Sequence, residues 1–210
     1  MIRTFRNTLL LAALLFMPAL AQAHHAEFMR DKPFLQGISM PIHGLDHMLV
    51  TIAVGLIAAQ IGGRALWAAP AVFTLAVLGG GIANLCGVPI PFVEQGILAS
   101  VAIFGALLAW RTHVSVAVTL LTIGLFAALH GNVLIANDGY VHFFPPFIAG
   151  CVISALALQA LGVGIGLALN KITRVPALRY AGFAMLTAAV LIAAFPSVND
   201  VVINLLEHSH

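Results

Sequence analysis

Six runs of about 20 mostly apolar residues follow one another along the chain, and they constrain its fold more than any other feature. In a bilayer every backbone polar group must be satisfied within the protein, so an apolar run of this length crosses as an α-helix. Charged residues make up only 8% of the chain, against about 25% in a soluble domain. We therefore predict an all-α, polytopic membrane helix bundle. The expected spans are residues 40–60, 64–82, 92–110, 113–131, 143–169 and 177–196.

The N-terminal segment is typical of a secretory signal peptide, with an uncleaved anchor helix as the alternative. Arg3 and Arg6 supply its basic region, residues 9–20 its apolar region, and Ala21-Gln22-Ala23 is a small-residue cleavage site. The predicted organisation is a signal peptide over residues 1–23, a periplasmic tail over 24–39, a six-helix transmembrane domain over 40–196 and a periplasmic tail over 197–210.

The basic residues predict how the spans are oriented. Cytoplasmic loops of membrane proteins carry an excess of Lys and Arg. Here the loops after the first, third and fifth expected spans carry such residues, whereas the loops after the second and fourth carry none. Both termini are therefore expected on the periplasmic side of a bacterial inner membrane. The basic residues concerned are Arg64, Arg111, Lys171, Arg174 and Arg179.

The first expected span opens with a group of polar side chains in the segment Pro41-Ile42-His43-Gly44-Leu45-Asp46-His47. An Asp at hydrocarbon depth costs about 2.5–3.5 kcal/mol, which makes it a candidate functional residue. On one continuous helix, His43, Asp46 and His47 have i, i+3, i+4 spacing and share a face. Two imidazole nitrogens and a carboxylate oxygen suit a divalent metal ion. The alternative is a polar patch at a helix end that satisfies its own hydrogen bonds.

Met40 extends this stripe, because it precedes His43 by three residues and His47 by seven. As a ligand, its thioether would favour a soft ion such as Cu(I). Packing in the core or against lipid is the alternative for this methionine.

Glu94 and His130 lie near the outer ends of their expected spans, at the same depth as Asp46. Glu94 is the other acid placed in an apolar span, and it is a candidate carboxylate ligand facing Asp46. Its alternative role is to stabilise a helix N-terminus through the helix dipole. His142 and Asn132 are further candidates for the lining of an outer vestibule, with Asn132 expected in a loop after the fourth span.

Several other classes of function are excluded by what the sequence lacks. It has no G-x-x-x-x-G-K-[ST] motif for ATP, and its basic residues are scattered and do not form a nucleic-acid interface. A metal hydrolase with Glu94 as base is the last of the alternatives, because the sequence has no H-E-x-x-H motif. The run Gly162-Val163-Gly164-Ile165-Gly166 follows no strand and is not a nucleotide loop. Cys86 and Cys151 have no C-x-x-C partners and are expected as core residues, with their pairing left open.

At these residues the chain resembles the HupE/UreJ family, membrane proteins associated with hydrogenase and urease maturation. Its pattern His-Pro-x-x-Gly-x-Asp-His, followed by Ala-Val-Gly-Leu, corresponds to residues 40–47 and 53–56, with Met40 in place of the first His. A Pro-x-Val-Glu-x-Gly-Ile run corresponds to residues 91–97, and a His-Gly pair to residues 130–131. The chain departs from the family in the region after that pair and at Gln159, where the pattern has a His.

The resemblance implies an inner-membrane permease that moves a divalent transition-metal ion, nickel or cobalt, without ATP hydrolysis. The ion is cargo; no prosthetic group is expected, and the chain is not expected to be an enzyme. The other expected partners are the lipid bilayer and metalloenzyme maturation proteins. A membrane metal chaperone and a copper-handling variant are the alternatives. The residues carried over are Asp46, His47, Glu94 and His130, with His43 and Met40 as helpers.

Overall fold

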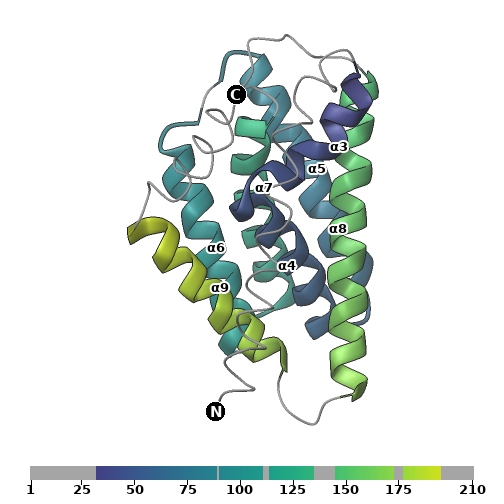
Figure 1. The fold of residues 1–210 in the computed structure, drawn as a ribbon, viewed down its shortest axis with the longest axis vertical. Coiled ribbons are helices and arrows are strands. Elements are labelled where there is room, and N and C mark those ends of the chain that lie inside the picture. Colours follow the sequence, from purple (N-terminus) through teal and green to yellow (C-terminus); the bar gives the residue numbers. More distant parts are fainter. Residues whose placement is uncertain (1–31, 89, 111–113, 135–144, 173–176, 195–210) are drawn as a thin grey trace, which may run out of the picture.

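Seven α-helices and no strands make up the described part of the chain, which comprises residues 32–88, 90–110, 114–134, 145–172 and 177–194 of a computed structural model (Figure 1). The predicted all-α bundle is therefore confirmed. The helices are α3 (Pro33–His43), α4 (Leu45–Ile61), α5 (Ala65–Leu85), α6 (Val93–Trp110), α7 (Val116–Leu134), α8 (Pro145–Ile172) and α9 (Ala177–Ala194).

Helices α5, α6, α7 and α8 are each long and apolar enough to cross a membrane. The bent pair α3–α4 passes the same test when its two halves are taken together, and the apolar part of α9, Leu178–Ala194, is shorter. Large apolar side chains stand exposed on the outside of the bundle, which is a surface suited to lipid rather than to water. They include Trp67, Leu75, Leu121, Leu125 and Val190. The chain is thus a multi-pass membrane protein.

Helix α4 lies in the interior of the bundle and contacts α8, α6 and α5 (Figure 1). Three other helix pairs pack extensively, namely α5 with α7, α6 with α9 and α3 with α8. The 28 residues of α8 extend about 42 Å at 1.5 Å per residue. This length lets α8 support α3 with its first turns and α4 with its later ones.

Glycines stand where the paired helices cross, and they allow the two backbones to touch. A Cβ added at any of them would overlap or crowd the facing helix. In lipid, where burial of apolar surface gives no driving force, such close packing holds helices together. The pairs are Gly37 and Gly150 between α3 and α8, Gly55 and Gly162 between α4 and α8, Gly80 and Gly131 between α5 and α7, and Gly105 and Gly182 between α6 and α9.

The first expected span is not one helix, and this prediction was wrong. The helix ends at His43, Gly44 is extended with φ −114° and ψ 130°, and α4 begins at Leu45. The two halves meet at 80°. Residues 33–39, expected in a periplasmic tail, belong to α3 and pack on α8. His43 and Asp46 therefore lie on different helices, and the shared helical face predicted from their spacing does not exist.

Other predictions fall outside the described residues or differ in detail. The signal peptide, the C-terminal tail over 197–210, His142, Arg111 and Arg174 lie outside the described residues. Asn132, expected in a loop, lies in the last turn of α7. Cys86 and Cys151 are both free thiols, and neither is the core residue that was expected, since Cys86 is exposed and Cys151 is half-buried.

Candidate metal site

The elbow between α3 and α4 places Asp46 and His47 in the first turn of α4. Pro41 has no N–H to donate to the preceding turn of α3, and Gly44 follows three residues later, so the helix stops there. A Cβ at Gly44 would overlap the Asp46 carboxylate, so a larger residue there would displace this side chain. The carboxylate lies at a helix N-terminus, where the helix dipole favours negative charge.

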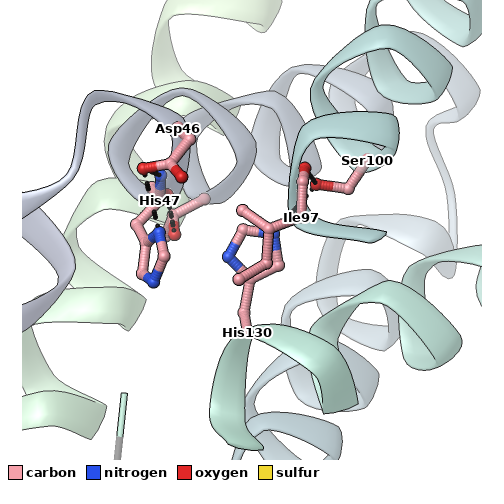
Figure 2. Close-up of polar contacts among 6 residues, drawn as sticks. Asp46, His47, Ile97, Ser100 and His130 are labelled. Atoms are coloured by element: carbon pink, nitrogen blue, oxygen red, sulfur yellow. Dashed lines mark hydrogen bonds and ion pairs between the residues drawn. The ribbon is translucent and has the colours of Figure 1, made fainter. Parts of the chain in front are cut away.

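Asp46 fixes the protonation pattern of the neighbouring His47 ring. Its Oδ1 atom accepts the backbone N–H of His47 at 2.8 Å and lies 3.0 Å from Nδ1 of the same residue (Figure 2). Because an ionised carboxylate only accepts hydrogen bonds, Nδ1 carries the proton. The lone pair of His47 then resides on Nε2, as it does in metal-binding histidines held by a carboxylate.

Ser100 fixes the ring of His130 in the same way. The Ser100 hydroxyl donates its single proton to the Ile97 carbonyl at 2.5 Å, so it accepts from His130 Nε2–H at 2.9 Å. The lone pair of His130 is therefore on Nδ1. His130 lies on α7, is 1% exposed and cannot exchange this partner for bulk water. In each histidine, one ring nitrogen is thus hydrogen-bonded to Asp46 or Ser100, and the other has a lone pair that can bind a ligand.

The two imidazole rings come from different helices and lie next to each other, with the edge of one toward the other (Figure 2). Their centroids are 4.7 Å apart, and the angle between the two ring planes is 72°. Both rings line a cavity of about 30 Å³ under the elbow, which is room for a water molecule or a bare metal ion. Walls from α3, α5, α7 and α8 surround it, and most of their side chains are apolar.

Three further polar side chains line the same cavity, namely Thr51, Thr74 and Cys151. The Thr51 hydroxyl donates to the His47 carbonyl at 2.7 Å, whereas the buried Thr74 hydroxyl has no hydrogen-bond partner among the described residues. Cys151 adds a sulfur, the softest donor in the wall. Within the described residues, no three His, Cys, Asp or Glu side chains gather closely enough to hold a metal. The arrangement offers two nitrogens in an open site, not a closed structural one.

The family model described as HupE / UreJ protein matches residues 11–192. The chain belongs to the HupE/UreJ family. Protein HupE of Rhizobium leguminosarum bv. viciae is 33% identical over 184 residues, which cover 86% of this chain and 94% of that protein. No solved structure matches the chain.

In this HupE/UreJ chain, the residues predicted from the sequence divide into two groups. His47 and His130 meet at the cavity and Asp46 binds the His47 ring, although the expected helical stripe is broken. Glu94 is exposed at the start of α6, and within the described residues no ion pair or hydrogen bond joins it to Asp46. Met40 is half-buried on α3 and is not part of the cavity wall. The backbone of His43 ends α3 beside the elbow.

Sequence interpretation gave no role to Ser100 or Thr74, expected Cys151 only as a core residue, and placed Asn132 in a loop that lines the vestibule. The first three act through contacts or a cavity that only tertiary structure creates. Asn132 is a structural link, because its amide donates to the carbonyls of Gly80 and Val88 and accepts from Asn84 and Ile90. Its position two residues after His130 was the available signal, since a buried amide beside a site residue needs partners.

Proposed function

We propose that this chain is an inner-membrane permease that moves a divalent transition-metal ion, nickel or cobalt, into the cytoplasm. The observation that carries the proposal is the pair of opposed imidazoles at the break between α3 and α4. Membrane transporters commonly bind ions at interrupted helices, where polar groups face a cavity instead of lipid. Membership of the HupE/UreJ family supports the same conclusion.

The donor atoms favour borderline ions over hard ones. Imidazole nitrogen binds nickel, copper, zinc and iron, whereas magnesium and calcium require oxygen ligands. Only two imidazoles face the cavity among the described residues, and water is expected to complete the coordination. A loose site of this kind releases its ion readily, which transit requires. The copper-handling alternative loses support from Met40, which is not in the cavity wall, and gains some from Cys151.

The membrane potential is sufficient to drive uptake without ATP. Moving one charge with the field gains about 2.3 kcal/mol per 100 mV, so a dication gains roughly 4–5 kcal/mol. This corresponds to about three powers of ten in accumulation per 100 mV. The chain itself therefore needs no nucleotide site for uptake.

The chemical difference between the two ends of the bundle supports the predicted orientation. The ends of α4, α6 and α8 meet, because Gln60 donates to the Leu108 carbonyl at 3.2 Å and Asn170 to the Ala59 carbonyl at 3.4 Å. Arg64 and Lys171 are exposed at this end. The histidines lie at the opposite end of α4. We propose that the basic end is cytoplasmic and that the cavity opens toward the periplasm.

Reporter fusions test this orientation. Fusions after Lys171 should report a cytoplasmic location, and fusions after Asp138 and His210 a periplasmic one, because basic residues are retained inside. A periplasmic signal at Lys171 would contradict the six-span topology.

Uptake into proteoliposomes tests the transport itself. We expect the purified protein to accumulate Ni²⁺ or Co²⁺ when a potassium gradient and valinomycin set an inside-negative potential, and not to accumulate Mg²⁺. The rate should rise with the imposed potential, since the cargo carries two charges. The panel should include copper, zinc and manganese, and empty liposomes provide the control. Absence of uptake for every ion, with metal binding retained, would favour the chaperone alternative.

The remaining alternative, a metal hydrolase with Glu94 as base, finds no support in the site. A general base must lie within hydrogen-bond reach of the reacting water at the metal. Glu94 is exposed on α6 and makes no hydrogen bond to Asp46 in the described part of the chain. We therefore propose a non-enzymatic role.

A further inference from the structure

Gln159 on α8 is a fully buried side-chain amide that the described residues leave without a partner. It is 0% exposed, and neither its Nε2 nor its Oε1 atom has a hydrogen bond. An amide that loses its water and gains no partner is strongly unfavourable in an apolar interior. Buried polar groups without partners in native proteins commonly receive an ion or a water molecule.

Other side-chain amides of the bundle, including the buried Asn132, make hydrogen bonds. Asn132 uses both its nitrogen and its oxygen on neighbouring groups, and Asn84 donates twice to Asn132. Gln60 and Asn170 each donate to a carbonyl of a facing helix. Gln159 therefore differs from these amides, because it has no hydrogen bond within the described residues.

Gln159 lies directly below the histidine cavity. Cys151 and Ala155 line that cavity, and Gln159 is one helical turn beyond Ala155, which is about 6 Å along α8. On the facing helix, Gly55 is one turn beyond the cavity residue Thr51 and packs against the backbone of Gln159. Gln159 is thus the next buried polar residue along α8 from the cavity toward the basic end.

We propose that Gln159 forms a second station on the path of the ion, where its amide oxygen contacts a divalent transition-metal ion or a water molecule that the ion retains. This inference rests on the permease function proposed above and adds a residue to it. An amide oxygen is a weaker ligand for such ions than an imidazole nitrogen. A strong site followed by a weaker one lets the ion move on, because conduction needs several sites of limited affinity.

The substitution Gln159→Leu tests the second station. It removes both polar atoms at similar size, and it should not prevent folding, because it removes an unpaired polar group from the interior. We expect Co²⁺ binding to the detergent-solubilised variant, followed by visible absorption, to stay within about twofold of wild type. Potential-driven Co²⁺ uptake into proteoliposomes should fall at least about tenfold, since the path loses its polar group below the cavity. Gln159→His, which keeps a donor atom at this position, should retain more uptake than Gln159→Leu.

The matched control is Gln95→Leu, the same substitution at an exposed glutamine on α6, which should leave uptake unchanged. If wild type and Gln159→Leu take up Co²⁺ equally, the second station is refuted while the permease proposal stands. Equal losses in Gln159→Leu and Gln159→His would assign Gln159 a packing role and also refute the station. If the wild type transports no ion, the permease proposal fails and this inference fails with it.

Discussion

Replacing His130 with glutamine is expected to reduce metal uptake by more than about a hundredfold, beyond the ~10–100-fold typical for groups that only orient a ligand. The glutamine amide nitrogen can reach the position of Nε2 and keep the hydrogen bond to Ser100, which spans 2.9 Å in the wild type. It cannot supply the lone pair of Nδ1. The substitution therefore preserves the buried contact and removes the donor that α7 contributes to the cavity.

Binding and uptake should be measured together for this variant. Isothermal titration with Ni²⁺ and Co²⁺ should show weakened binding, and proteoliposome uptake should fall in parallel. Thr119→Ala is a suitable control, because Thr119 is also buried on α7 and its hydroxyl only donates to the Ser115 carbonyl. Wild-type binding by His130→Gln would show that His130 serves packing between α6 and α7 and not the ion.

The fold was predictable because a bilayer reduces the choice of structures. Apolar runs of sufficient length must be helices, and glycines, prolines and polar residues mark their ends. The expected span 92–110 corresponds to α6 at Val93–Trp110, and 177–196 to α9 at Ala177–Ala194. Because these limits follow from local composition, they needed no knowledge of the tertiary contacts.

The break at Gly44 was missed for a physical reason. A single glycine within an apolar run is usually tolerated in a helix, so hydropathy gives no indication of a bend. The break combines Pro41, which frees a carbonyl of α3, with Gly44, where a Cβ would overlap the Asp46 side chain. The second of these conditions exists only in three dimensions.

The partner of His130 was equally inaccessible to sequence analysis. Ser100 lies on another helix, thirty residues away in the sequence. No spacing rule connects two residues on different helices; the packing of α6 against α7 alone brings them together. In contrast, Asp46 and His47 are neighbours in sequence, so their association could be expected from local chemistry.

Replacing Asp46 with asparagine is expected to lower both metal affinity and uptake by about 10–100-fold, the range found when the partner of a ligating histidine is changed. Asparagine has the same shape and can still accept the two N–H groups that the Oδ1 atom of Asp46 binds in the wild type. What disappears is the negative charge, which makes the His47 ring a stronger donor and attracts the cation. The variant should insert normally, since the substitution removes a charge from a membrane-spanning segment.

The substitution Glu94→Gln removes the same charge at an exposed position and is the comparison for Asp46→Asn. Glu94→Gln is expected to reduce uptake less than Asp46→Asn, because an exposed carboxylate acts on the ion only through a field that salt screens. Raising the ionic strength should therefore diminish the effect of Glu94→Gln and leave that of Asp46→Asn nearly intact. Equal, salt-independent losses would instead support the shared carboxylate site predicted from the sequence. If Asp46→Asn binds the metal with wild-type affinity, Asp46 serves only to cap α4. The two histidines would then bind the ion without help from its charge.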